Sequence, residues 1–148
     1  MRAILFRGKR VDNGEWVYGD LAHSVRSANG RKPHKSWIVD GYFSNGGWLT
    51  PLKRYAVIDK SIGEYTSLKD RNGNEIFEGD ILIYVVDGEY GVDEKYLVVF
   101  DDDEAAFRTK YYCKDKYMSY VDIVPCEHFE VIGNIYDNPE LLNGKQRR

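Results

Sequence analysis

The sequence contains little cysteine, histidine and proline, and it has no long hydrophobic run. Its two cysteines, Cys113 and Cys126, could form a disulfide, but two thiols in 148 residues fit a reducing compartment better. Near the start, only four uncharged residues separate Arg2 from Arg7, far fewer than the core of a signal peptide needs. The longest strongly apolar run, residues 81–86, is too short to cross a membrane. We therefore expect a cytoplasmic protein without a membrane segment.

Motifs of known catalytic sites are also missing. There is no Walker A loop, dinucleotide fingerprint or nucleophile elbow, and the three histidines and two cysteines lack the spacing of a zinc site. Cys126 and His128 could pair a nucleophile with a base, but near neighbours along a chain seldom converge. We predict a protein that needs no cofactor or metal and is not an enzyme.

Carboxylates near residues 59–80 leave one enzymatic alternative open. Residues 70–81 have the length of a calcium loop, but Glu75 and Ile81 stand where that loop requires Gly and Glu. Carboxylates at hairpin corners more often bind backbone N–H groups than perform acid–base chemistry. An enzyme with an unrecognised carboxylate site is our third hypothesis. Its candidate residues are Asp59, Glu64, Glu75, Glu78 and Asp80.

Turn signals are abundant and predict a mainly β protein. Residues 13–21 (NGEWVYGDL) recur, with one insertion, as residues 72–81 (NGNEIFEGDI). Each copy places Asn-Gly, which suits a tight hairpin turn, before an apolar segment and a Gly-Asp corner. Residues 81–86 are apolar at both parities, so we predict that this strand lies centrally and is covered on both faces. Asp137-Asn138-Pro139 predicts a short C-terminal helical turn.

The length fits a single domain, residues 1–148. Within it we expect N-terminal hairpins and a basic loop over residues 1–60, a barrel-like core over residues 61–142, and a basic tail over residues 143–148. Residues 1–60 carry 11 Lys/Arg and 5 Asp/Glu, whereas residues 61–148 carry 10 and 19. Two interpretations remain open: the two halves share one mixed surface, or a basic face and an acidic face let copies stack head to tail.

Three stretches resemble the YopX family of phage and prophage proteins. They are residues 6–21 (FRGKR to EWVYGDL), residues 62–81 (IGEYTSLKD to EIFEGDI) and residues 130–142 (EVIGNIYDNPELL). Ser67 departs from the glycine that the family often has there, and Lys60-Ser61 replaces a Pro-containing turn. The resemblance implies a mainly β protein with an SH3-like or pseudo-barrel core, encoded by a phage and working in a bacterial cytoplasm. It implies no catalytic residues.

Two functions remain as hypotheses beside the enzyme. The first is a noncatalytic module that binds an unknown phage or host bacterial protein, or assembles with itself into a homo-oligomer, because Tyr and Trp are enriched at interfaces. The alternative is nucleic-acid binding by basic residues that lie near Trp16, Tyr18 and Trp37, with charge for phosphates and rings for stacking. The candidate nucleic-acid residues are Arg7, Lys9, Arg10, Arg26, Arg31, Lys32 and Lys35.

Overall fold

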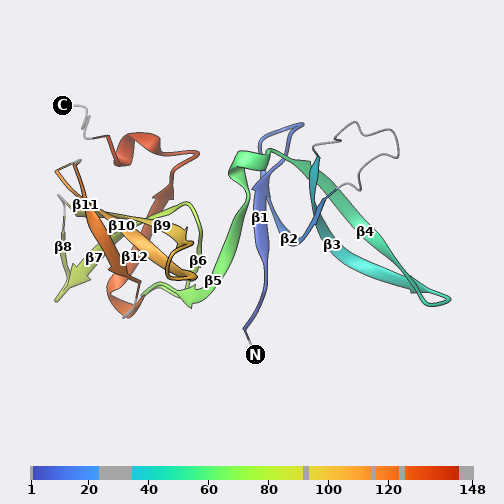
Figure 1. The fold of residues 1–148 in the computed structure, drawn as a ribbon, viewed down its shortest axis with the longest axis horizontal. Coiled ribbons are helices and arrows are strands. Elements are labelled where there is room, and N and C mark those ends of the chain that lie inside the picture. Colours follow the sequence, from blue (N-terminus) through green and yellow to red (C-terminus); the bar gives the residue numbers. More distant parts are fainter. Residues whose placement is uncertain (1, 24–34, 92–93, 115, 124–125, 144–148) are drawn as a thin grey trace. The chain divides into compact units, whose positions relative to one another are not determined.

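The computed structural model describes residues 2–23, 35–91, 94–114, 116–123 and 126–143. These residues form antiparallel β structure with short helical turns, which confirms the predicted mainly β class (Figure 1). The chain divides into two compact units, Met1–Glu64 and Tyr65–Arg148. The strands are β1 (Phe6–Lys9), β2 (Trp16–His23), β3 (Ser36–Asn45), β4 (Trp48–Val57), β5 (Gly63–Lys69), β6 (Glu75–Phe77), β7 (Asp80–Val86), β8 (Glu89–Tyr90), β9 (Glu94–Asp101), β10 (Ala106–Cys113), β11 (Lys116–Asp122) and β12 (Phe129–Asn134). The 3-10 turns are η1 (Asp59–Ser61), η2 (Cys126–His128) and η3 (Pro139–Leu141).

The first unit is a meander in which β4, β3, β2, β1 and the start of β5 lie in that order. Its main buried apolar side chains are Ile38, Val39 and Val57. The chain after β4 returns to β1, where the Ile58 N–H donates to the Lys9 carbonyl over 2.8 Å. The apolar core of this unit is therefore small, and backbone contacts contribute much of its cohesion.

Two glycines allow strands of the first unit to approach closely. A Cβ built at Gly19 would lie 2.1 Å from the Val39 carbonyl oxygen, and one at Gly8 would lie 3.0 Å from the Val57 Cβ. Gly19 and Asp20 lie inside β2, so the first copy of the repeated phrase has no corner there. In the second copy, Gly79 has φ +87° and makes the turn before β7. The two similar phrases therefore fold differently.

The second unit contains a five-stranded sheet in the order β11, β10, β9, β7, β12. β7 is central and is buried on both faces, as its apolar pattern predicts. Leu82 belongs to a cluster on one face with Ile76 and Phe129. Its neighbour Ile81 belongs to a second cluster, which Leu142 after η3 covers. The C-terminal turn thus covers the second apolar cluster.

The predicted barrel-like core is not a closed barrel. The described strands form two antiparallel sheets and no closed barrel, because β12 pairs with β7 and leaves β11 at the opposite edge. The C-terminal turn is present as the 3-10 turn η3. Asn138 does not cap η3 with its side chain but accepts a hydrogen bond from the Asn134 N–H over 3.3 Å. Among the described residues, no helix is long and apolar enough to span a membrane.

Candidate functional site

The β1–β2 hairpin brings two predicted basic residues beside two aromatic rings. Its antiparallel register pairs Arg7 with Tyr18 and Lys9 with Trp16, so all four side chains belong to one face. The Arg7 guanidinium carbon lies 4.7 Å from the centre of the Trp16 ring, and the Lys9 ammonium lies 5.8 Å from it. Both distances fit cation–π contacts.

Exposure decides which of these groups a ligand can reach. Arg7 is buried, with 7% of its surface exposed, so its charge is enclosed by the hairpin. Lys9 and Trp16 are half-buried, and Tyr18 is 47% exposed. The reachable part of this face is therefore one cation with two rings, which we call the hairpin face (Lys9, Trp16 and Tyr18).

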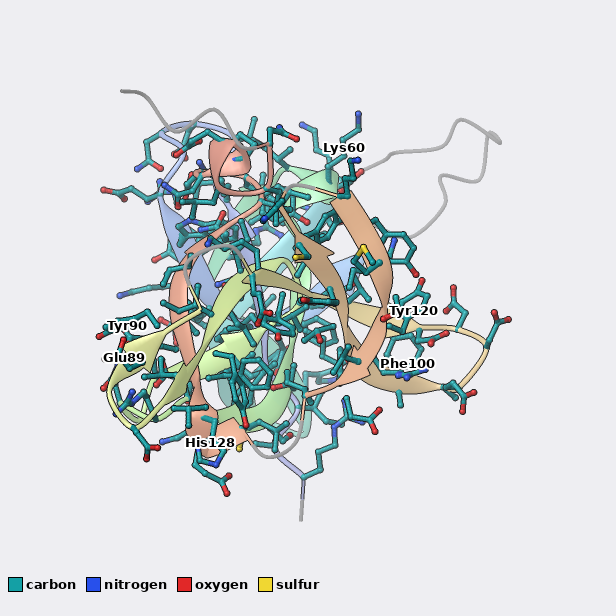
Figure 2. All side chains as sticks on the ribbon, turned by 90° about the vertical axis from the view of Figure 1, so that its left-hand side faces the viewer. Lys60, Glu89, Tyr90, Phe100, Tyr120 and His128 are labelled. Atoms are coloured by element: carbon teal, nitrogen blue, oxygen red, sulfur yellow. The ribbon has the colours of Figure 1, made fainter. Side chains whose placement is uncertain are left out.

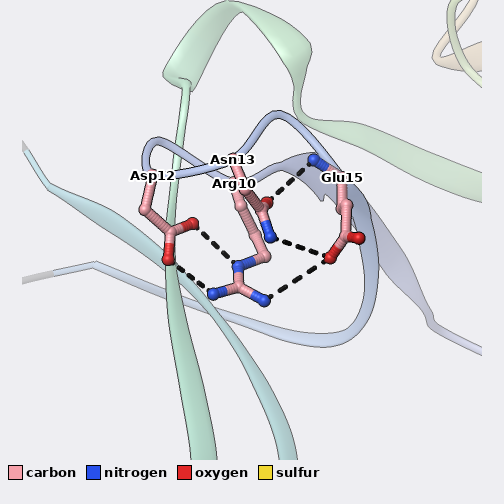
Figure 3. A network of polar contacts seen from close by, with 4 residues as sticks. All are labelled: Arg10, Asp12, Asn13 and Glu15. Atoms are coloured by element: carbon pink, nitrogen blue, oxygen red, sulfur yellow. Dashed lines mark hydrogen bonds and ion pairs between the residues drawn. The ribbon is translucent and has the colours of Figure 1, made fainter.

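Arg10 is held by acidic neighbours within its own turn (Figure 3). Its Nε donates to the Asp12 carboxylate over 2.9 Å, and its Nη1 lies 3.7 Å from the Glu15 carboxylate. Asn13 braces the turn by donating to the same Glu15 carboxylate over 2.8 Å. The hydrogen bond from Arg10 lowers the pKa of the Asp12 carboxyl and raises that of the Arg10 guanidinium. The Arg10 charge is thus balanced locally, which reduces what it offers to a phosphate.

The remaining predicted nucleic-acid residues lie in the basic loop before β3. Lys35 is exposed immediately before this strand. Arg26, Arg31 and Lys32 lie outside the described residues. The structure therefore brings together Arg7 and Lys9, places Arg10 in a separate set of contacts, and leaves the basic loop as a prediction.

A long hairpin, one of the N-terminal hairpins that the sequence predicts, projects from the first unit, and sequence reasoning gave it no role. β2 pairs with only residues 36–39 of β3, whereas β3 and β4 pair along their whole length. The distal part, residues 40–53, is therefore two-stranded, and we call it the arm (Figure 1). Trp48, which follows the Gly46-Gly47 turn at its tip, is 80% exposed. On β3, burial raises the pKa of Tyr42, and the nearby Asp20 carboxylate raises it further.

Two carboxylates of the enzyme hypothesis, Asp80 and Glu64, have different partners. Asp80 is buried and accepts a hydrogen bond from the Phe77 N–H over 2.8 Å, while Glu64 forms an ion pair with Arg2. Within the described ranges, no group of three His, Cys, Asp or Glu side chains could hold a metal ion. Cys113 and Cys126 are free thiols, so no disulfide joins them. The enzyme hypothesis gains no geometric support from these residues.

Asp70, in the second unit, accepts four hydrogen bonds, and sequence reasoning gave it no role. Its Oδ1 accepts the N–H groups of Asn72 and Asn74 over 2.9 and 2.8 Å. Its Oδ2 accepts the Asn74 amide over 3.1 Å and the Val131 N–H over 3.0 Å. Burial raises the pKa of Asp70, but these hydrogen bonds outweigh it and lower the pKa overall. An Asp two residues before an Asn is a known turn signal, so the local hydrogen bonds of Asp70 have a sequence signal. Its hydrogen bond to Val131 of β12 joins distant positions and has none.

The fold and surfaces define the class of protein. It is a two-unit antiparallel β protein with a hairpin face and an exposed arm, and one of its buried carboxylates, Asp70, binds backbone N–H groups.

The chain belongs to the YopX family, since the family model for the YopX protein matches residues 5–143. The resemblance predicted from the three stretches is thus confirmed. The crystal structure of protein EF1440 from Enterococcus faecalis is similar, with 25% sequence identity and a TM-score of 0.55 over 96% of this chain and 99% of that chain. No curated protein matches this chain.

Proposed function

We propose that this protein is a noncatalytic binding module, encoded by a phage and acting in the bacterial cytoplasm, whose arm binds a protein partner. The family supplies the expectation of a phage origin, and Trp48 at the arm tip supplies the binding surface. Tryptophan is enriched among residues that dominate interface energies. An 80% exposed Trp48 therefore marks the arm tip as the contact point.

The arm's construction supports a role in binding. An isolated two-stranded hairpin is only marginally stable in water, because it lacks a third strand or a packed layer. Burial of Trp48 and Tyr42 against a partner would supply the missing layer. Tyr42, on the same arm, is 43% exposed and would add contact area. The arm is thus suited to a contact that forms when the partner is present.

Site-specific photo-crosslinking tests this function. A photoreactive residue replaces Trp48 in one variant and Tyr90 in a matched control, since Tyr90 is 51% exposed in the second unit. Both variants are expressed in bacteria, and the crosslinked protein is purified and titrated against the wild-type chain. We expect crosslinking only from position 48, and a loss of about tenfold or more in affinity for W48S, as for an interface hot spot. Equal binding by W48S and wild type would reject the arm as the binding site.

The hairpin face supports a second candidate, binding of single-stranded nucleic acid. Lys9 stands beside Trp16 with Tyr18 on the same face, which combines a cation with stacking surfaces. The exposed Lys35 and the rest of the basic loop would extend the charge. Reversing the charges of Arg31, Lys32 and Lys35 should then abolish an interaction that weakens with salt. Binding of an oligonucleotide that survives this change would move the contact away from the basic loop.

A further inference from the structure

The two edge strands of the sheet in the second unit, β12 and β11, differ in whether another segment covers them. At β12, the Arg71 N–H donates to the Phe129 carbonyl over 3.0 Å, and Asp70 accepts the Val131 N–H. The loop after β5 therefore covers that edge. At the other edge, β11 pairs with β10 alone within the described part of the chain. Uncovered edge strands are sites where another strand can add to a sheet.

β11 is also the most exposed long strand of this unit. Every residue of it except Val121 is exposed. Tyr117, Met118 and Tyr120 are 50%, 58% and 39% exposed, and Tyr120 projects outward from the strand (Figure 2). The Tyr117 and Tyr120 rings lie edge to face with centres 6.2 Å apart, and the Lys110 ammonium lies 5.9 Å from the Tyr120 ring. These ring contacts therefore fix the exposed tyrosine side chains of β11 in the unbound chain.

The sequence of β11, KYMSYVD, is complementary to itself when two copies run antiparallel. Lys116 stands at one end and Asp122 at the other, so each lysine end meets the aspartate end of the second copy. The exposed tyrosines and Met118 of the two strands then face one another between these ends. Arg108 holds the Asp122 carboxylate in place, with Nε 3.3 Å from Oδ1. Opposite charges at the two ends favour this register and disfavour the parallel one.

We propose that β11 is the interface for a second copy of this chain, which adds its own β11 antiparallel at this edge. The interface lies in the second unit and uses residues other than those of the arm, which belongs to the first unit. A register shift opposite Tyr111 and Tyr112 bends β11. The pairing is therefore short, and we expect dissociation constants on the order of micromolar.

Sedimentation equilibrium of the full chain provides the first test. Wild type should dimerise with increasing concentration, and Y120K should weaken the dimer about tenfold or more by placing a charge in the centre of the paired strands. The matched control is Y90K, because Tyr90 is also an exposed tyrosine of the second unit but lies on β8. Circular dichroism checks that both variants fold. A wild type that stays monomeric, or a Y90K defect equal to that of Y120K, would overturn the proposal.

Charge reversal provides a sharper test, because a folding defect cannot mimic its result. K116D alone and D122K alone should each dimerise about tenfold more weakly, since like charges then meet at both ends of the pairing. An equimolar mixture of the two should form a heterodimer of near wild-type affinity, and the double variant should recover the homodimer. A mixture no tighter than its components would show that these ends do not meet, and the proposal would fail.

Discussion

The two units of this protein keep their strands together by different means. The second unit has a central strand between two apolar layers, one containing Leu82 and the other containing Ile81. The first unit has fewer buried apolar side chains among its described residues and relies on close backbone approach at Gly19 and on cations stacked over Trp16. Apolar burial is the main source of folding free energy, so the second unit should be the more stable.

Their charges and aromatic residues differ as well. Residues 1–64 carry a net charge of +5 and residues 65–148 one of −8. All three tryptophans fall in the first unit, whereas nine of the twelve tyrosines fall in the second. Tryptophan fluorescence therefore reports on the first unit alone, and near-ultraviolet dichroism of tyrosine reports mainly on the second. This separation of probes lets each variant below be assigned to a unit.

The largest expected effect is that of G19A on the first unit. The added Cβ would lie 2.1 Å from the Val39 carbonyl oxygen, so β2 and β3 must separate. We expect a loss of more than about 4 kcal/mol in the free energy of unfolding, the range reserved for severe packing conflicts. Denaturant titration should shift the tryptophan transition strongly.

G14A is the matched control, because nothing lies within 4 Å of a Cβ at Gly14, although its φ of +74° adds some backbone strain. G14A should therefore cost much less than G19A. If G19A moves the tyrosine signal as far as the tryptophan signal, the two units unfold together and the comparison between them fails.

D70A should have the next largest effect, and it should act on the second unit. Removing the carboxylate leaves the Val131 N–H and the turn amides without their acceptor, which should cost about 3 kcal/mol. The lowered pKa of Asp70 adds a pH dependence. Its stabilisation is present above about pH 4, the unfolded pKa of an aspartate, and is lost as the pH falls through the lower pKa of the folded state.

Acid titration of the tyrosine dichroism checks this dependence, with D70N as the control that keeps the shape of the side chain. D70N should lose the Asp70 contribution to the acid transition while retaining part of the turn. An unchanged acid transition in D70N would assign the pH dependence to other carboxylates.

Local patterns predicted part of this fold, and long-range pairing decided the rest. The apolar run at 81–86 correctly indicated the central strand β7, because only a strand covered on both faces needs apolar residues at both parities. A proline such as Pro51 usually ends a strand, but β4 continues through it, since an edge strand tolerates a missing N–H. No local signal indicates the tight β10–β11 turn, because Lys114, with φ +47°, is neither glycine nor asparagine.

In the candidate sites, too, local patterns predicted some features, and contacts in the folded chain decided the others. Sequence placed Lys9 near Trp16 correctly, because a hairpin register is set locally. It could not show that Arg7 is enclosed or that Asp12 and Glu15 balance Arg10, since burial and ion pairing depend on the folded surroundings. The repeat of the Gly-Asp phrase was misleading for the same reason: Gly79 turns the chain, while Gly19 lies within a strand that β3 approaches closely.

S67G should stabilise the second unit by a smaller amount. Ser67 has φ +68°, a left-handed conformation that suits glycine better than a residue with a Cβ. This position is where the family often has glycine, and we expect a gain of about 0.5–1 kcal/mol. S67A keeps the Cβ and serves as the control, so it should show no gain. A gain in the tryptophan transition instead of the tyrosine signal would place the effect in the wrong unit.

The smallest effect concerns the alkaline limit of the second unit. Burial raises the pKa of Tyr111, and hydrogen bonds to Cys113 and Glu94 raise it further, to about 12. The Tyr111 hydroxyl donates to Glu94 over 3.1 Å, and Tyr96 donates to the other oxygen of the same carboxylate over 3.3 Å. Because the folded pKa is raised, the stabilisation is complete below pH 10 and is lost as the pH rises through about 12.

Spectrophotometric titration of Y111F should therefore lose one late-ionising tyrosine, and the alkaline unfolding of the second unit should become shallower. Y117F is the control, since Tyr117 is 50% exposed and packs only against other rings in the contacts described. Its loss should leave the late component of the titration unchanged. If Y111F also leaves that late component unchanged, Tyr111 ionises as an exposed phenol does, and the second unit lacks the buried alkaline limit that distinguishes it from the first.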